Sequence, residues 1–299
     1  MQMPAPSATI LARRAEIVAA LQAVLPGDAV IERESELKAY ECDALTAYRC
    51  PPLAVVLPRT TEEVASALKV CYQHGVPVIP RGAGTSLAGG SLPTADSVVI
   101  GTARMAGVLE TGRTNLSVTA EITDDGWFYA PDPSSQLACA ISGNIAMNSG
   151  GAHCLKYGVT VNNLLGVRIV LMDGTIADIG GGYMDAGDLD LLSVVCGAEG
   201  QLGIVTEATL RILPKPEGAR PMLIAFDSAD VAGACVSDII RAGVLPVAIE
   251  YMDRPCIRAC EAFAKAGYPD CEALLIIEVE GSEGEIAHQL GLIRAIAET

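Results

Sequence analysis

Basic residues are scarce in this sequence. Its 299 residues include 20 lysines and arginines against 36 aspartates and glutamates, which gives a formal net charge of −16. Because DNA, RNA and anionic membrane surfaces attract clustered positive charge, this balance argues against nucleic acid as a partner. A site for a phosphate-bearing ligand would have to rely on backbone N–H groups and a few local cations.

Patterns of metal ligands are also lacking. The ten cysteines form no C-x-x-C pair, and the only histidines are His74, His153 and His288. Cys256 and Cys260 have helical spacing, which we interpret as a shared buried face rather than a pair of ligands. We therefore expect no metal site, and the scattered free thiols indicate a reducing cytoplasm.

Long apolar runs are absent as well. No uninterrupted stretch of about 18 apolar residues occurs, so we expect no membrane-spanning segment. Arg13, Arg14 and Glu16 interrupt the apolar residues near the start, which argues against a secretory signal. With 51% hydrophobic residues, the chain is long enough for two domains with sizeable cores.

One glycine-rich stretch, residues 76–91 (V-P-V-I-P-R-G-A-G-T-S-L-A-G-G-S), organises the chain. Residues 76–79 predict a buried strand that ends at Pro80, and the loop after it contains no acidic group. Glycines allow positive φ and close approach of backbone N–H groups to phosphate oxygens, although such a loop alone could equally be a surface turn. Leu87 replaces the third glycine of G-x-G-x-x-G, which disfavours an NAD-binding enzyme, and no Gly-Lys-Ser/Thr follows, which excludes a P-loop.

The segments around this loop predict a β-α-β unit. We expect helices over 8–24 and 35–40, strands over 53–57 and 98–100, and a helix from Thr60 to His74 that ends at Gly75. Thr60 and Glu63 match a capping box, in which each side chain satisfies the other's backbone donor. The loop 80–91 would then lie at the carboxyl end of a strand, where ligands bind in such units.

A second loop-rich stretch spans 130–158, and its apolar residues suggest that the turns pass through the interior and need a polar partner. A hairpin is expected over 167–178, a helix over 188–195 and a strand over 204–212.

After Leu213-Pro214-Lys215-Pro216 the pattern restarts as strands 222–226, 246–251 and 273–280 and helices 229–242, 254–265 and 283–297. It ends in a helix at Thr299, so we expect an incomplete second domain.

Four segments together resemble the flavin dehydrogenases of the vanillyl-alcohol-oxidase/PCMH superfamily: 80–90, 129–135, 142–158 and 199–207. The most similar branch holds the FAD-linked subunit of glycolate oxidase and the D-lactate and D-2-hydroxyglutarate dehydrogenases. The resemblance implies an α+β fold with a PCMH-type FAD-binding domain over 1–215. The start of an α/β (ferredoxin-like), substrate-binding cap domain would occupy 216–299.

By this resemblance, FAD contacts four groups of residues. The glycine loop should hold the pyrophosphate, the middle segments should line the dinucleotide and flavin, and the last segment should reach the adenine or ribose end. The implied cofactor-binding residues are Pro80, Arg81, Gly82, Ala83, Gly84, Thr85, Ser86, Gly89, Gly90, Pro131, Asp132, Ser135, Gly143, Asn144, Asn148, Gly150, Gly151, Gly203, Ile204 and Val205. Thr85 stands where covalent relatives carry a flavin-linking His, so we expect non-covalent FAD.

Two departures from the family pattern stand out. After Glu110 the chain is about a dozen residues too short for two strands that relatives place over the flavin. The family's His and acidic motifs for base and metal also have no counterpart, so no catalytic residue is assigned. His153 lies in the flavin-facing motif, and a structural role for it is favoured over a catalytic one.

The function that this resemblance implies is FAD-dependent oxidation of a small D-2-hydroxy acid, glycolate or D-lactate, to the 2-oxo acid. The alternative is a flavin-binding or assembly subunit without turnover. Partner subunits, a second flavin subunit and an iron–sulfur subunit, would accept the electrons. We expect a cytoplasmic protein, or one held at the inner membrane through those partners.

Overall fold

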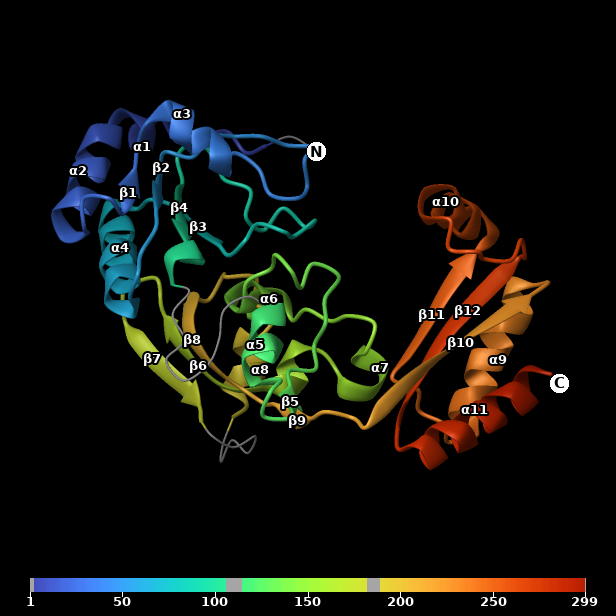
Figure 1. Cartoon of the computed structure of the whole chain (residues 1–299). Coiled ribbons are helices and arrows are strands. Elements are labelled where there is room, and N and C mark those ends of the chain that lie inside the picture. Colours follow the sequence, from blue (N-terminus) through green and yellow to red (C-terminus); the bar gives the residue numbers. More distant parts are fainter. Residues whose placement is uncertain (1–2, 106–114, 182–188, 299) are drawn as a thin grey trace. The chain divides into compact units, whose positions relative to one another are not determined.

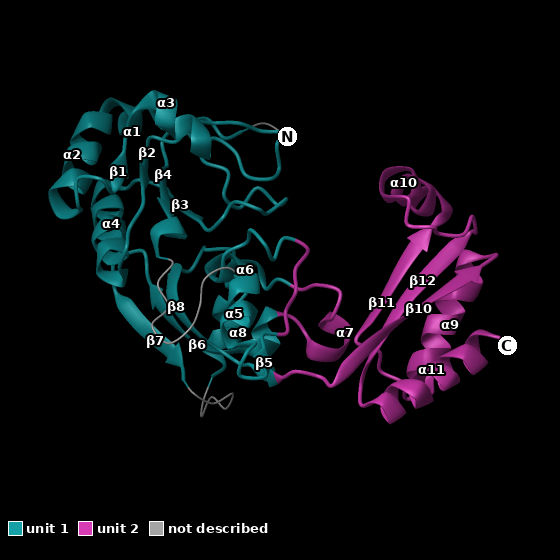
Figure 2. Cartoon of the chain, viewed as in Figure 1, with its two compact units in different colours: residues 1–129, 135–149, 160–213 teal, residues 130–134, 150–159, 214–299 magenta. Residues whose placement is uncertain are grey.

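The computed structural model describes residues 3–105, 115–181 and 189–298 (Figure 1). The chain divides into two compact units (Figure 2). Unit 1 comprises residues 1–129, 135–149 and 160–213, and unit 2 comprises residues 130–134, 150–159 and 214–299. The prediction that the segment after Glu110 is too short for two strands of the family pattern concerns a segment that begins outside the described residues.

Unit 1 contains a four-stranded sheet in the order β1-β2-β4-β3. Its strands are β1 (Val30–Ile31), β2 (Ala54–Val56), β4 (Val98–Gly101) and β3 (Val78–Arg81). β2 and β3 both pair in parallel with β4, so the expected β-α-β unit encloses a third strand between its two strands. Every residue of β4 is buried, as expected for a central parallel strand covered on both faces.

The last residues of β3 differ from the sequence interpretation. The strand does not stop at Pro80: Pro80 pairs with Ile100 and Arg81 with Gly101. Proline is tolerated here because β3 is an edge strand. On its open side there is no neighbouring strand among the described residues, so the missing N–H removes no hydrogen bond between strands there. The strand therefore carries Arg81 directly into the glycine-rich loop.

Two helices, α2 (Arg14–Val24) and α4 (Thr61–His74), pack against this sheet. The expected single helix over 8–24 is divided at Arg13 into α1 (Ala8–Ala12) and α2. The fully buried side chains of Ile17, Leu21 and Leu68 fill the space between the helices and the strands. This cluster is the main core of unit 1.

Only half of the predicted capping box at α4 forms. The Thr60 hydroxyl accepts from the N–H of Glu63 at 3.2 Å, as expected. The Glu63 carboxylate, however, accepts from the N–H of Arg59 at 2.7 Å and not from that of Thr60. At the other end the prediction is confirmed, because Gly75 ends the helix at φ +65°.

A second, antiparallel sheet of unit 1 has the order β7-β6-β8, with β7 (Ile176–Gly180), β6 (Leu164–Val170) and β8 (Ile204–Leu210). β6 and β7 form the predicted hairpin. The helices α6 (Ile141–Met147) and α8 (Leu191–Val195) pack on this sheet through Ile145 and Val195. The remaining elements are α3 (Glu34–Leu37), η1 (Lys38–Tyr40), η2 (Thr102–Arg104), α5 (Asn115–Ile122), β5 (Trp127–Phe128), η3 (Thr160–Asn163) and β9 (Leu213–Pro214).

Unit 2 is a three-stranded antiparallel sheet in the order β10-β12-β11 with helices. Its elements are α7 (Cys154–Tyr157), β10 (Gly218–Phe226), α9 (Ala229–Arg241), β11 (Ala248–Asp253), α10 (Arg254–Ala264), β12 (Ala273–Gly281) and α11 (Glu283–Ala297). Alternate residues of β12 point to opposite faces. Leu275, Ile277 and Val279 pack against α9 and α11, whereas Glu278 and Glu280 lie on the other face.

The cysteine pair of α10 does not form a shared buried face. Cys256 is exposed and Cys260 is half-buried, while Ile257 supplies the buried side of the helix. The spacing is helical, as predicted, but it does not indicate which side of this amphipathic helix meets the sheet. All ten cysteines are free thiols.

No helix within residues 3–105, 115–181 and 189–298 has both the length and the apolar character needed to cross a lipid bilayer.

Leu68 gives a direct test of the unit 1 core. Leu68→Ala leaves a cavity beneath α4, so we expect the free energy of unfolding to fall by about 2–5 kcal/mol. Lys69→Ala, on the exposed side of the same helix, is the matched control and should change it by less than about 0.5 kcal/mol. Urea unfolding followed by circular dichroism measures both, and equal effects would contradict the assigned packing.

Candidate functional site

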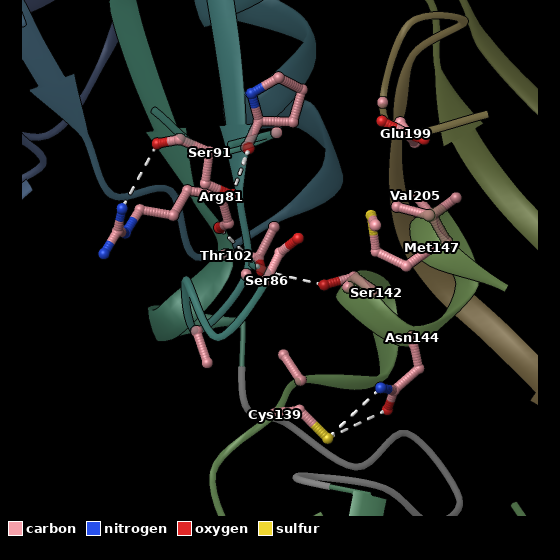
Figure 3. A pocket seen from close by; sticks show the side chains of 18 of the residues that line it. Arg81, Ser86, Ser91, Thr102, Cys139, Ser142, Asn144, Met147, Glu199 and Val205 are labelled. Atoms are coloured by element: carbon pink, nitrogen blue, oxygen red, sulfur yellow. Dashed lines mark hydrogen bonds between the residues drawn. The ribbon is translucent and has the colours of Figure 1, made fainter. Parts of the chain in front are cut away.

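A pocket with a cavity volume of about 330 Å³ lies within unit 1. Its wall comes from the end of β3 and the following loop, the α6 segment, and residues 195–205 leading into β8. This volume is within the range of small-molecule sites. Figure 3 shows Arg81 and Ser91 on one side and Met147, Glu199 and Val205 on the other.

At Gly84, the glycine loop has a backbone conformation that strongly favours glycine. Gly84 has φ +73°, and a Cβ there would lie 2.6 Å from Cζ of Arg81. Gly82 runs close to α6, because a Cβ on it would lie 3.4 Å from that of Ala140. Backbone N–H groups can therefore approach a ligand without side chains in between, which is the geometry of an anion cradle.

Arg81 ties the ends of this loop together. Its Nη1 donates to the carbonyl oxygen of Cys42 at 2.8 Å. It also donates to that of Ser91 at 3.4 Å (Figure 3). Its guanidinium also lies over the ring of Tyr40, 5.7 Å from the ring centroid. The side chain thus organises the loop through carbonyl oxygens, and we propose that the anion is held mainly by backbone and hydroxyl donors.

The opposite wall is built on polar contacts of α6. The hydroxyls of Ser142 and Thr102 lie 3.1 Å apart and join α6 to the end of β4. Asn144 is buried and bonds through its side chain to Cys139 and Asn115. Asn144 therefore fixes the wall from within, whereas Ser142 and Thr102 present hydroxyls to the cavity.

The structure brings most of the predicted cofactor-binding residues to this pocket. The residues that line it are Pro80, Arg81, Gly82, Ala83, Gly84, Thr85, Ser86, Gly90, Ser135, Gly143, Asn144, Gly203, Ile204 and Val205. Gly89 and Asn148 are in unit 1 but outside the lining. Asn148 has φ +47°, ends α6, and accepts from the N–H of Val161 at 3.0 Å.

Four of the predicted residues belong to unit 2 instead: Pro131, Asp132, Gly150 and Gly151. Their segments pack with the sheet of unit 2, and sequence order alone gives no sign of this assignment. Conversely, Thr102, Ser142 and Glu199 line the unit 1 pocket although the sequence analysis assigns them no role. Ser142 and Glu199 are within the resembling segments, so their motifs could have indicated them.

Charged side chains of unit 2 meet around His153. Its Nδ1 lies 3.1 Å from Oδ2 of Asp132, and its Nε2 lies 3.6 Å from Oε2 of Glu278 on β12. Next to it Glu280, only 8% exposed, accepts from Lys156 at 2.8 Å and from the Tyr157 hydroxyl. These contacts attach residues 150–159 to the polar face of the unit 2 sheet.

The other histidines have different surroundings. His74, at the end of α4, lies 2.7 Å from Nη2 of Arg13, and His288 is exposed on α11. Within the described residues, no group of three His, Cys, Asp or Glu side chains is arranged to hold a metal ion.

Comparison with known proteins decides the family. Residues 52–180 match the model of an FAD binding domain, and residues 215–299 match that of the C-terminal domain of FAD linked oxidases. The chain is 31% identical over 314 residues to an uncharacterized FAD-linked oxidoreductase of Mycobacterium tuberculosis, covering 95% of this chain and 67% of that protein. The chain belongs to the FAD-linked oxidoreductase family.

Other relatives carry more specific names. Glycolate oxidase subunit GlcD of Escherichia coli K12 is 44% identical over 285 residues, which cover 91% of this chain and 57% of that protein. D-lactate dehydrogenase of Archaeoglobus fulgidus is 33% identical over 264 residues, covering 82% of this chain and 59% of that protein. The chain thus spans somewhat more than half the length of these relatives.

Solved structures agree on the fold. Alkyldihydroxyacetonephosphate synthase has a TM-score of 0.82 at 19% identity, covering all of this chain and 60% of that one. p-Cresol methylhydroxylase has a TM-score of 0.78 at 16% identity, and the match covers 98% of this chain and 65% of that one. The expected α+β, PCMH-type fold is confirmed.

FAD is the cofactor of this family, and the residues present fit it. The pyrophosphate of a dinucleotide matches a loop in which a Cβ at Gly84 would strain the backbone at φ +73° and displace the Arg81 guanidinium. The hydroxyls of Thr85, Ser86 and Ser142 can add donors, and Met147, Ile204 and Val205 can cover the faces of planar rings. We propose Ser142 and Met147 as FAD contacts in addition to the residues predicted from sequence.

Gly84 provides the test of the cradle. Gly84→Ala should lower the affinity for FAD at least about tenfold, because the new methyl group meets the Arg81 guanidinium and distorts the loop. Gly126→Ala is the matched control, since Gly126 has φ +84° but open space around it. Flavin released by acid from each purified protein gives its occupancy, and equal loss in both variants would rule out the assigned cradle.

Asp132 gives a second test, on the pH dependence of stability. Burial raises the pKa of its carboxyl above the ordinary value, while the charge on His153 acts in the opposite direction. A carboxyl with a raised pKa binds its proton more tightly in the folded state than in the unfolded state. Its protonation therefore adds to the free energy of unfolding in full below about pH 4, and this stabilisation is lost as the pH rises through the folded pKa.

We therefore expect the free energy of unfolding of the native protein to fall relative to that of Asp132→Asn as the pH rises from about 4. Asp125→Asn, at an exposed turn, should show no such difference. Urea titrations at a series of pH values measure this, and parallel curves for native protein and Asp132→Asn would contradict the assigned burial.

Proposed function

We propose that this chain is the FAD-binding portion of an oxidoreductase that oxidises a small D-2-hydroxy acid, glycolate or D-lactate, to the 2-oxo acid. The glycine cradle of unit 1 carries the proposal, because it fits the pyrophosphate of FAD. The names of the two relatives, glycolate oxidase subunit and D-lactate dehydrogenase, supply the substrate class.

The roles of the chain's own residues follow from their places. Bound FAD supplies the acceptor for the two electrons that leave the substrate. Arg81 and Gly84 shape the loop that holds its phosphates, and Thr85, lacking a nucleophilic nitrogen, leaves the cofactor non-covalent. The oxidation also needs a base for the substrate hydroxyl, and His153 is the histidine of this chain that lies between two carboxylates.

Partner subunits form part of the proposal. The name of the Escherichia coli relative is that of a subunit, and electrons that reach FAD must leave it for another acceptor. A second flavin subunit and an iron–sulfur subunit are the partners that we propose. The cytoplasmic or membrane-peripheral location stays a prediction.

Anaerobic mixing tests the function. We expect glycolate and D-lactate to bleach the flavin absorbance of the FAD-loaded chain, and L-lactate to leave it unchanged. The reaction should be about 10²–10⁴-fold slower than in full-length glycolate oxidase subunit GlcD, because the family's base motifs have no counterpart here.

Two other outcomes have clear meanings. Bound flavin that neither glycolate nor D-lactate bleaches would favour a flavin-binding subunit without turnover. Bleaching as fast as in the full-length relative would place the base within these residues, and His153→Gln would then be the variant to measure, with His288→Gln as its control.

A further inference from the structure

Two thiols lie next to each other on α10 of unit 2. Cys256 and Cys260 are about one helical turn apart, so their Cβ atoms are neighbours at about 5–6 Å. Cys256 is exposed and Cys260 is half-buried, so solvent reaches the pair. The expectation that both side chains are buried, which argued against a pair of ligands, therefore no longer applies.

α10 is held in one orientation on the sheet of unit 2 (Figure 1). Ile257, only 2% exposed, packs with Cys271 and Leu274, and this contact fixes the side of the helix that meets the sheet. At the start of the helix, the Asp253 carboxylate accepts from the N–H of Cys256 at 2.9 Å. The two thiols are therefore carried at a fixed spacing by a helix that is anchored at its start and along one side.

The two thiols also affect each other's chemistry. The contact with the Cys260 thiol raises the pKa of Cys256 above its ordinary value, and desolvation and the charge of Asp253 act in the same direction. At neutral pH, Cys256 is therefore a protonated thiol and not an activated nucleophile, which requires a lowered pKa. A cation bound to both sulfurs would stabilise the thiolates, and the charge of Asp253 would then be favourable.

The basic side chains of α10 are already paired with carboxylates. Arg254 lies 2.9 Å from Glu272, and Arg258 lies 3.3 Å from Asp270. Their positive charges are thereby balanced, and the chain as a whole carries a net charge of −16. These surroundings favour a cation between the two sulfurs over a pair of bare thiolates.

The number of ligands decides which cation fits. Within the described residues, no group of three His, Cys, Asp or Glu side chains is arranged around a common point. The buried Cys271 is engaged elsewhere, because its Sγ donates to the carbonyl oxygen of Ala273 at 3.2 Å. Zinc in structural sites takes four ligands, so two sulfurs do not suit it. Soft thiolates select monovalent copper, which is stable with two sulfur ligands.

We propose that Cys256 and Cys260 form a two-sulfur site for a soft, thiophilic cation, Cu(I). Binding replaces two S–H bonds with two Cu–S bonds and releases two protons, while copper and sulfur keep their oxidation states. The affinity should therefore rise with pH, by up to about 100-fold per pH unit while both thiols are protonated. This site goes beyond the proposed oxidation of a hydroxy acid and does not depend on FAD.

Competition for Cu(I) tests the site. The protein is titrated under anaerobic conditions against the chelator bicinchoninate, whose coloured copper complex reports the copper that the protein does not hold. Cys256→Ala or Cys260→Ala should weaken the binding of one copper equivalent at least about 100-fold, because the second Cu–S bond of the pair forms within one molecule. Cys50→Ala, which removes a half-buried thiol of unit 1, is the control and should leave this equivalent unchanged.

A rearranged pair separates the spacing of the thiols from their number. Cys256→Ala combined with Ala262→Cys keeps ten cysteines and puts the new one at an exposed position two residues after Cys260. Side chains two residues apart on a helix do not face each other, so this variant should bind copper as weakly as Cys256→Ala.

Phenylarsine oxide gives an independent measurement of the same geometry. Its arsenic atom exchanges oxygen for two sulfurs, and the oxygen leaves with the two thiol protons as water. Mass spectrometry of digested native protein should find one phenylarsenic group that joins Cys256 and Cys260, and the rearranged variant should lack it on α10.

Three results would overturn the inference. They are a native protein that takes no copper from the chelator, a rearranged variant that holds copper as tightly as the native protein, and an affinity that does not change between about pH 6 and 8. Each leaves the proposed function intact, because none of these measurements involves flavin. A protein that failed to bind FAD would likewise leave this site standing.

Discussion

The bonds from the Arg81 guanidinium to two carbonyl oxygens are the interaction on which the pocket of unit 1 depends. One partner, Cys42, lies far back in the chain, and the other, Ser91, closes the loop that Arg81 begins. A cation placed under the loop leaves the backbone N–H groups free to face a ligand, and it stabilises the carbonyl oxygens that turn away. Gly84 is the consequence, because a side chain there would occupy the place of the guanidinium.

The net negative charge of the chain makes this arrangement informative. A phosphate site could have been built from lysines and arginines on the surface, but the sequence has few of them. The pocket instead combines oriented backbone groups with hydroxyls, which bind phosphate without a large positive field. This also explains how a carboxylate such as Glu199 can share the same cavity.

Much of the architecture was predictable from the sequence because the signals were local. The Thr60 cap, the end of α4 at Gly75 and the alternation of Leu275 and Ile277 each depend on neighbouring residues. The glycine loop and the segment 199–207 predicted the pocket, since their motifs reflect direct requirements of a ligand.

Other features could not be predicted because they depend on contacts between distant residues. The direction of the Arg81 side chain is decided by Cys42, and the burial of α10 is decided by the sheet it meets. The assignment of residues 130–134 and 150–159 to unit 2 depends on partners in β12, where Glu278 meets His153 more than a hundred residues later. No local pattern encodes such a partner.

The interleaving of the two units has a consequence for the order in which the protein is made. Glu278 follows His153 by 125 residues, so a ribosome working at about 5–20 residues per second completes the segment 150–159 roughly 6–25 s before its partner strand exists. During that interval the histidine and its neighbours have no sheet to join. Unit 1 can form its pocket walls in the meantime, but the segments 130–134 and 150–159 must wait as open loops until β12 emerges.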